Sequence, residues 1–265
     1  MKKVTLLILA LILAFSLCAC GEKPTMDSEE NWTEGLRYYQ MKDGTYSVSA
    51  LAETRLLEEI IIPATFLGKT VTRIDASAFA GAQNLVKITI PDLITEIGGN
   101  AFTGCSSLTN VTIPDSVTVI ERAAFKDCSS LTSVVIPDNV TCISDEAFYG
   151  CSRLMRIDLP DGITSIGDKA FSGCSSLTDI TIPNNVTHIG EWAFDHCTGL
   201  TSITIPNGVT DIGEYVFNYC TGLTGITIPN SVTHIGKFAF QDCTSLTSIT
   251  IPNSVTDIGD HAFNY

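Results

Sequence analysis

The sequence predicts an all-β-leaning solenoid, in which about nine short units of one repeating pattern stack on each other. Two observations support this prediction. A Thr- and Ile-rich stretch with strand propensity ends in Ile-Pro or Leu-Pro in unit after unit, and a Phe follows each pair at a fixed distance. These pairs recur every 23 residues, at Pro91, Pro114, Pro137, Pro160, Pro183, Pro206, Pro229 and Pro252. One unit cannot bury its apolar side alone, so the units are expected to share a continuous core.

Residues 1–19 are predicted to be an export signal rather than part of the fold. A basic start precedes an apolar run that is too short to cross a bilayer comfortably. The run ends in Leu17-Cys18-Ala19-Cys20, which resembles the bacterial lipobox. Cys20 has the small residue before it and the Leu three places before it, whereas Cys18 does not. The resemblance implies that Cys20 is the lipidated residue, with a plain secretory signal as the alternative.

The next two segments lead into the repeats. Residues 20–35 are polar and acidic without periodicity, so we expect a flexible tether. In residues 36–56, strand-forming stretches flank the Lys-Asp-Gly sequence at 42–44, which is a hairpin signal. The hairpin is expected to cap the N-terminal end of the solenoid, because terminal units need a polar outer face. The first unit, which begins at Pro63, is five residues longer than the others.

Each unit divides into three parts, as the unit at 200–220 illustrates. Residues 200–206 are predicted to form a strand that the proline ends. Residues 209–212 are predicted to form a second extended segment on another wall. Residues 213–220 then turn the corner, with Phe217 as a large inward side chain.

The full pattern L-x-x-I-x-I-P-x-x-V-T-x-I-G-x-x-A-F-x-G-C resembles the BspA-type leucine-rich repeat family of bacterial surface proteins. The resemblance covers residues 57–265 and implies a leucine-rich repeat solenoid. The chain lacks the buried Asn ladder of ordinary leucine-rich repeats, which fits this variant. Several family members are adhesins that contact host or matrix proteins, and this implies a theme rather than a particular partner.

The charge balance and the missing motifs exclude several classes of function. The chain has 29 acidic residues against 15 basic ones, which argues against nucleic acid and against docking on an anionic membrane surface. Nucleophile-elbow, phosphate-loop, zinc-protease and EF-hand motifs are missing from the sequence. We therefore expect neither an enzyme nor a bound metal or cofactor.

One position of the unit is a cysteine in seven of the units. A nucleophile is not needed seven times, no His keeps a fixed relation to this position, and zinc sites usually have Cys-x-x-Cys pairs. Ala82 fills the position in the first unit, so a small apolar group suffices. We predict buried reduced thiols, with disulfides between units as the alternative. The seven are Cys105, Cys128, Cys151, Cys174, Cys197, Cys220 and Cys243.

Two adjoining columns lie on the predicted second wall. The first is Thr in all nine units, from Thr72 to Thr256, and we expect neighbouring hydroxyls to contact each other. The second column ends in His188, Asp211, His234 and Asp257. At strand spacing of about 4.8 Å these side chains could share protons or a metal ion. We favour a solvated column of alternating charge.

A third column lies two residues before each Phe, and it changes character along the chain. Its first five residues are Ser77, Asn100, Ala123, Glu146 and Lys169, and its last four are Trp192, Tyr215, Phe238 and His261. Such a row of rings can stack on sugars or anchor a protein partner. The alternative is that the rings pack on each other and on the corner, which requires no ligand.

The predicted strand wall is a further candidate surface. We expect it to be concave, hydroxyl-rich and nearly uncharged, with an area of roughly 650–850 Å² from nine strands at about 4.8 Å spacing. One side of a standard protein interface is about 800 Å². The outward threonines that we single out as ligand-binding are Thr181, Thr204, Thr227 and Thr250.

Together these features predict a lipid-anchored, surface-exposed protein of the bacterial envelope that binds a host, matrix or other cell-surface protein. Glycan capture for nutrient uptake through the aromatic column is the alternative function. At the C-terminus, the ninth unit ends before its column cysteine and no capping segment follows. We expect its apolar side chains to fray, to pair with another copy or to meet further units of a longer chain.

Overall fold

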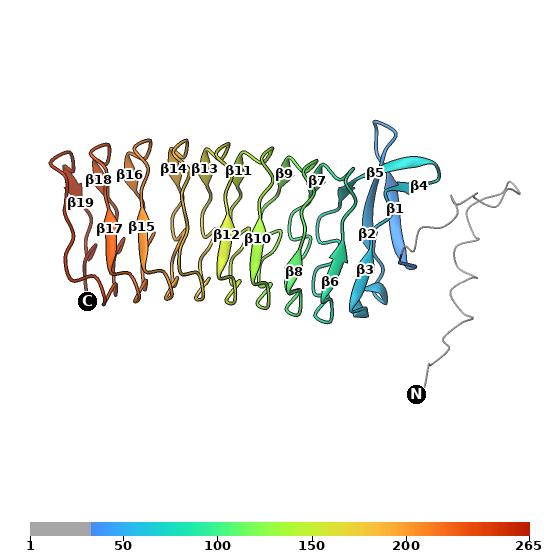
Figure 1. The fold of residues 1–265 in the computed structure, drawn as a ribbon, viewed down its shortest axis with the longest axis horizontal. Coiled ribbons are helices and arrows are strands. Elements are labelled where there is room, and N and C mark those ends of the chain that lie inside the picture. Colours follow the sequence, from blue (N-terminus) through green and yellow to red (C-terminus); the bar gives the residue numbers. More distant parts are fainter. Residues whose placement is uncertain (1–32) are drawn as a thin grey trace, which may run out of the picture.

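The computed structural model describes residues 33–265, which form a row of flattened turns running from the N-terminal cap to residue 265 (Figure 1). The predicted solenoid is confirmed, with about nine turns. The described residues contain no α-helix, and their only helical segment is the short 3-10 turn η1 (Thr54–Leu56). The fold is therefore a β-solenoid, without the helices that many leucine-rich repeats carry.

One wall of each turn is formed by the extended stretch that ends at the proline, and we call it the strand wall. Its strands pair in parallel, with equivalent residues side by side, such as Ile88 with Val111 and Val134 with Ile157. In β15, for example, Ile203 points inward and the hydroxyl side chains of Ser202 and Thr204 point outward, which gives the alternating burial. The strands are β3 (Glu59–Ile61), β6 (Lys87–Thr89), β8 (Asn110–Val111), β10 (Ser133–Val135) and β12 (Arg156–Asp158), followed by the pair β15 (Ser202–Thr204) and β17 (Gly225–Thr227).

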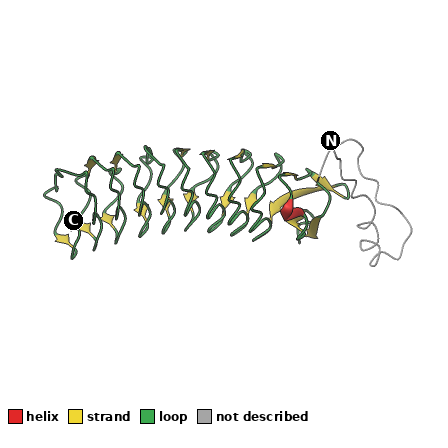
Figure 2. Cartoon of the chain, turned by 90° about the horizontal axis from the view of Figure 1, so that it is seen from below, coloured by secondary structure: helices red, strands yellow, loops and turns green. Residues whose placement is uncertain are grey.

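The opposite wall, which we call the second wall, carries one further short strand per turn. Here too the register follows the repeat, since Ile212, Ile235 and Ile258 lie side by side. Figure 2 shows the strands arranged along the length of the stack. They are β5 (Lys69–Ile74), β7 (Glu96–Ile97), β9 (Val119–Ile120), β11 (Cys142–Ile143), β13 (Ser165–Ile166), β14 (His188–Ile189), β16 (Asp211–Ile212), β18 (His234–Ile235) and β19 (Asp257–Ile258).

A column of phenylalanine rings runs through the core between the walls, among buried Ile, Leu and Val side chains. The residues from Phe79 to Phe240 at this position are fully buried. Neighbouring rings stack in parallel, from 5.1 Å between the centroids of Phe102 and Phe125 to 5.8 Å between Phe148 and Phe171. Burying such a ring stabilises the fold by about 1.5–3 kcal/mol, so each turn contributes similarly.

A hairpin caps the N-terminal end. β1 (Leu36–Gln40) pairs antiparallel with β2 (Tyr46–Ala50), and β2 pairs in parallel with β5. A second hairpin, which the sequence did not reveal, joins β4 (Thr65–Phe66) to β5. It uses the five extra residues of the first unit. Phe66 stacks on Tyr38 with 4.0 Å between ring centroids and meets the ring of Tyr46 edge-on at 5.3 Å.

Figure 1 shows an almost straight row of turns, so the strand wall is flat rather than concave. The predicted signal 1–19, Cys20 and most of the tether 20–35 lie outside the described residues. Between residues 33 and 265, none of the helical structure is long and apolar enough to span a membrane.

The last described turn keeps the register of the others, because β19 pairs with β18. Ile258 on β19 is 47 % exposed, whereas Phe263 is half-buried and its ring stacks on Phe240 at 5.2 Å. The apolar side chains of this last turn are therefore only partly exposed.

Candidate functional site

The cysteine column is structural. All seven thiols are buried and free, as predicted. Each Sγ–H donates to the carbonyl of the Phe in the preceding turn, at 3.1–3.3 Å. Burial raises the pKa of the Cys151 thiol to about 12 and holds the pKa of Cys174 well above its usual range. A buried thiol that resists ionisation is a poor nucleophile and a poor metal ligand.

The threonine column binds turn to turn, but not in the expected way. Most of its hydroxyls donate to the backbone carbonyl of the threonine one turn earlier, as Thr95 does to Thr72 at 3.1 Å. The prediction that neighbouring hydroxyls of this column contact each other is therefore wrong. The reason is the parallel ladder, in which the Thr95 N–H also bonds to the Thr72 carbonyl, at 2.8 Å. That carbonyl is the nearest acceptor for the hydroxyl.

The adjoining His and Asp column is a row of local pairs. His234 Nδ1 lies 2.9 Å from an Asp257 carboxylate oxygen, and Asp211 accepts a hydrogen bond of 2.6 Å from the Thr210 hydroxyl. Residues 33–265 contain no group of three His, Cys, Asp or Glu side chains placed to hold a metal ion. The geometry fits the solvated column of charges.

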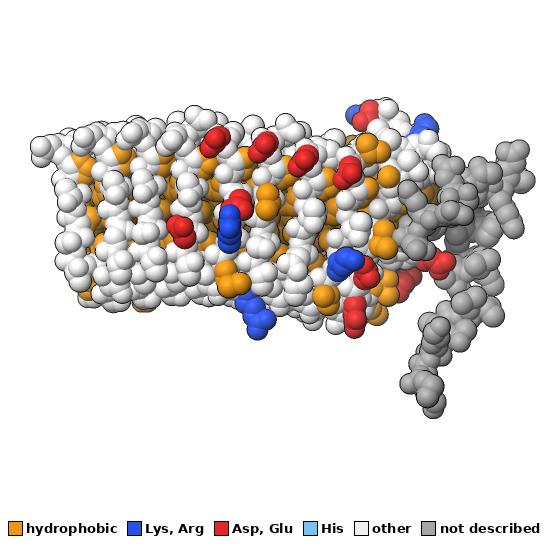
Figure 3. All heavy atoms as spheres, in the orientation of Figure 1, with side chains coloured by type: hydrophobic (Ala, Val, Ile, Leu, Met, Phe, Trp, Pro, Cys, Tyr) orange, Lys and Arg blue, Asp and Glu red, His pale blue; other side chains and the backbone are white. Residues whose placement is uncertain are grey.

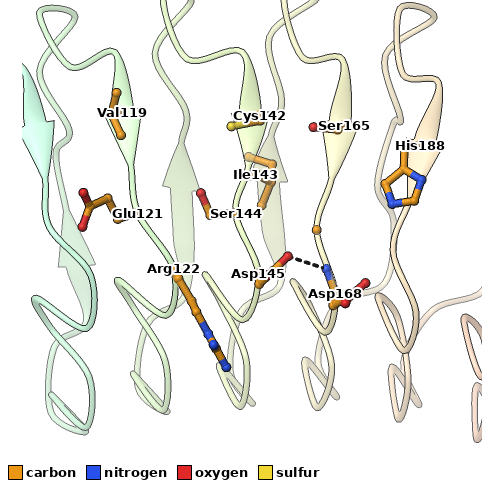
Figure 4. A pocket seen from close by; sticks show the side chains of 11 residues that line it. Val119, Glu121, Arg122, Cys142, Ile143, Ser144, Asp145, Ser165, Asp168 and His188 are labelled. Carbon is orange, nitrogen blue, oxygen red and sulfur yellow. Dashed lines mark hydrogen bonds between the residues drawn. The ribbon is translucent and has the colours of Figure 1, made fainter.

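A shallow hollow on the second wall lies between β9 and β14 (Figure 4). Charged side chains of this hollow form hydrogen bonds and ion pairs within the protein. The Asp145 carboxylate accepts a hydrogen bond of 2.9 Å from the Asp168 N–H, and Arg122 pairs with Glu146. Its exposed thiol, Cys142, and His188 have no hydrogen-bonded acid or base partner among the described residues. The hollow therefore holds no nucleophile with an activating base.

The aromatic column forms one continuous stack. Centroid distances are 3.7 Å between Trp192 and Tyr215, 4.7 Å between Tyr215 and Phe238, and 5.2 Å between Phe238 and His261. The Lys169 ammonium lies 5.7 Å from the Trp192 ring on the other side. The faces of the inner rings are therefore covered, and the rings present their edges to solvent. Sugar stacking needs a free ring face, which Tyr215 and Phe238 do not offer.

The backbone at this column was not foreseen. All nine of its residues have positive φ, between 55° and 61°, so we call it the first corner position. A second corner position with positive φ lies directly before the column cysteine. The residues there are Gly81, Gly104, Asp127, Gly150, Gly173, His196, Tyr219 and Asp242.

The second corner position carries a second ring row. His196 and Tyr219 stack with 4.6 Å between centroids. The His196 ring nitrogen also lies 2.8 Å from the carboxylate of Asp195, which accepts a hydrogen bond from Asn218. The sequence signal that could have revealed this row is the replacement of a recurrent Gly by larger residues from residue 196 onward.

The strand wall presents the predicted hydroxyl rows. Thr204 and Thr227 are exposed and lie side by side in β15 and β17. Thr181 and Thr250 occupy equivalent exposed places in turns that have no assigned strand on this wall. Together these four threonines form the face of the C-terminal turns.

Charge divides the strand wall along its length. Figure 3 shows a row of acidic side chains along one edge over the N-terminal turns, and mostly uncharged side chains over the C-terminal turns. The residue after the proline accounts for this change, since it is Asp in four successive turns and Asn in the next four. These residues are Asp92, Asp115, Asp138 and Asp161, then Asn184, Asn207, Asn230 and Asn253.

Comparison with known families agrees with this architecture. A family model described as the BspA type leucine rich repeat region matches residues 47–174 and 141–265, with 6 copies. The chain belongs to this family. A comparison with curated proteins gave no match.

Solved structures of other bacterial proteins resemble this BspA-type protein. A leucine rich cell surface protein from Faecalibacterium prausnitzii A2-165 is 29% identical, with a TM-score of 0.60, over 90% of this chain and 86% of that one. The leucine rich repeat protein TpLRR of T. pallidum is 25% identical, with a TM-score of 0.60, over 83% and 92% of the two chains. The pneumococcal vaccine antigen PcpA, at 17% identity and a TM-score of 0.52 over 86% and 84%, shares the fold.

Family membership gives this BspA-type protein a surface or protein-interaction role. The family is typically non-enzymatic. On the surfaces that its turns repeat, the described residues bring no nucleophile and activating base together.

Proposed function

We propose that this protein binds a protein of a host, a matrix or another cell at the bacterial surface, through the strand wall of its C-terminal turns. The observation that carries the proposal is the exposed, hydroxyl-rich and nearly uncharged face formed by Thr181, Thr204, Thr227 and Thr250. Such a face costs little to desolvate compared with a charged one. Its repeated backbone is held in register by the neighbouring turns, so little flexibility is lost on binding.

The size of the wall also suits a protein partner. Four turns at about 4.8 Å spacing give about 290–380 Å² of this wall, and all nine give roughly 650–850 Å². One side of a standard interface buries about 800 Å², so the partner is expected to extend from the C-terminal turns along the wall. The F. prausnitzii neighbour is called a cell surface protein, which supports the same location for this chain. Glycan capture through the aromatic column is the less favoured function, because the stack covers the faces of its inner rings.

We also propose that Cys20 anchors the protein to the bacterial membrane and leaves the solenoid exposed. The support is the lipobox-like sequence that ends at this residue. Acyl chains add about 0.8 kcal/mol of membrane affinity per buried methylene, so two or three chains hold firmly.

The binding proposal is tested with the full chain on panels of immobilised matrix proteins and glycans. In one variant Thr204→Arg and Thr227→Arg place two charges on the strand wall. The matched control, Thr187→Arg with Thr210→Arg, makes the same change on the second wall. We expect the first variant to lose at least about tenfold in affinity for a bound protein and the control to keep it. Equal binding by both variants, or binding to glycans alone, would contradict the proposal.

A further inference from the structure

The corner positions of the C-terminal turns carry side chains that the backbone does not favour. A positive φ disfavours bulky side chains and suits Gly or Asn. The solenoid supplies its own comparison, because Asn100 occupies the first corner position at φ 57° and Gly173 the second at φ 76°. Tyr215 and Tyr219 occupy these positions at φ 58° and 55°. The fold does not require rings here, so the rings are candidates for another role.

The rings expose their edges rather than hide them. Tyr219 is 41 % exposed, and Trp192 and Tyr215 are half-buried. Tyr and Trp are the residues on which protein interfaces most often depend, because they combine apolar area with a hydrogen-bonding edge. The stack holds the rings rigid, which reduces the entropy lost on binding. The corner therefore suits a protein contact better than a sugar contact.

Carboxylates accompany the rings. Glu191 and Glu214 directly precede Trp192 and Tyr215, and in the described chain neither carboxylate takes part in an ion pair. Equivalent residues of adjacent turns are about 4.8 Å apart, so Glu191 and Glu214 are neighbours along the corner. Lys169 already lies over the free face of Trp192, which shows that this end of the stack accepts a cation. Ring edges beside unpaired carboxylates are complementary to a side chain with an apolar stem and a cationic end.

We propose that this corner, made by Glu191, Trp192, Glu214, Tyr215 and Tyr219, binds an arginine-bearing segment of a protein partner. The guanidinium forms bidentate hydrogen bonds with a carboxylate, and its methylene stem lies along the ring edges. The inference rests on the proposed function only in taking a protein as the partner, because the corner is a different surface from the strand wall.

The probe is a synthetic peptide in which arginine alternates with serine, and the control peptide has glutamate in place of arginine. Binding is followed in the full chain by the fluorescence of Trp192, after Trp32→Phe removes the other tryptophan. We expect the arginine peptide to bind and the glutamate peptide not to bind. Added salt should weaken binding, since the contact is partly ionic.

Two variants decide the roles of the rings and the acids. Tyr215→Asn with Tyr219→Gly installs residues that equivalent turns already use, so its thermal midpoint should stay equal or rise. Glu191→Gln with Glu214→Gln changes charge alone. Each variant should weaken the arginine peptide at least about tenfold. Unchanged affinity in either variant, whatever its thermal midpoint, would overturn the proposal. Equal binding of the arginine and glutamate peptides would overturn it as well. The Thr204→Arg, Thr227→Arg variant should bind the peptide normally, so the corner and the strand wall can fail independently.

Discussion

A cysteine at the column position fills a small apolar space and also donates a hydrogen bond across turns. The Cys151 thiol is fully buried, and its sulfur lies 3.2 Å from the Phe125 carbonyl. The same carbonyl accepts the N–H of Cys128, at 3.2 Å. Ala82, which supplies only the apolar group, shows that the hydrogen bond is not essential to the turn.

This burial predicts a loss of stability at alkaline pH. The pKa of the Cys151 thiol rises from 9.0 to about 12 on folding, so the neutral thiol favours the folded state. Its contribution is complete below pH 9.0 and is lost as the pH rises towards about 12, because the unfolded thiol ionises first. The loss is about 1.4 kcal/mol for each pH unit. Urea unfolding at several pH values measures it.

The control for this prediction is Cys151→Ala, which places the side chain of Ala82 at the same position. The unfolding free energy of this variant should fall less steeply above pH 9.0 than that of the natural chain. Identical slopes would mean that the thiol ionises as easily in the fold as in the unfolded chain.

Among the elements, the cap differs most from the rest. The hairpins β1–β2 and β4–β5 meet through Tyr38, Tyr46 and Phe66, which lie outside the column of Phe pairs that joins the later turns. The cap thus depends on a small aromatic cluster outside the main core column.

We predict that Phe66→Ala loosens the cap and leaves distant turns intact. The change removes a half-buried ring that stacks on Tyr38, at a cost of about 2 kcal/mol. Because each turn contacts its neighbours only, amide exchange should accelerate in β1 and β2 and stay unchanged in β15 and β17. Leu67→Gly is the control, since Leu67 is exposed and has positive φ. Uniform acceleration along the chain would show that the cap is not a separate unit.

The elements also show what the sequence could predict. The first hairpin follows from local residues, because a Lys-Asp-Gly turn lies between two strand-forming stretches. The second hairpin cannot be predicted from the repeat, because residues 64–70 interrupt the period and have no equivalent in the other units. The ring column was found from spacing alone. Its stacking and positive φ were not, since a column shows which residues are neighbours but not how their side chains and backbone are oriented.

At the scale of the whole molecule, one end of the chain is proposed to hold the membrane and the other to hold a partner. We predict that Cys20→Ser releases the full chain from the membrane fraction or blocks its processing, because the acyl chains need the thiol. Fractionation followed by immunoblotting measures this. Cys18→Ser is the matched control and should remain with membranes. The opposite pattern would assign the anchor to Cys18.

The ladders that join successive turns have a mechanical consequence. Their backbone hydrogen bonds run along the length of the stack, so a pull on its two ends loads the interfaces between turns in series, and the weakest interface breaks first. A turn that comes away frees 23 residues, which extend by about 80 Å at 3.3–3.6 Å each. If such a chain held a cell under flow, it would lengthen in steps as single turns unfold, and each step would dissipate mechanical energy. The turns that remain stacked would keep their surfaces intact.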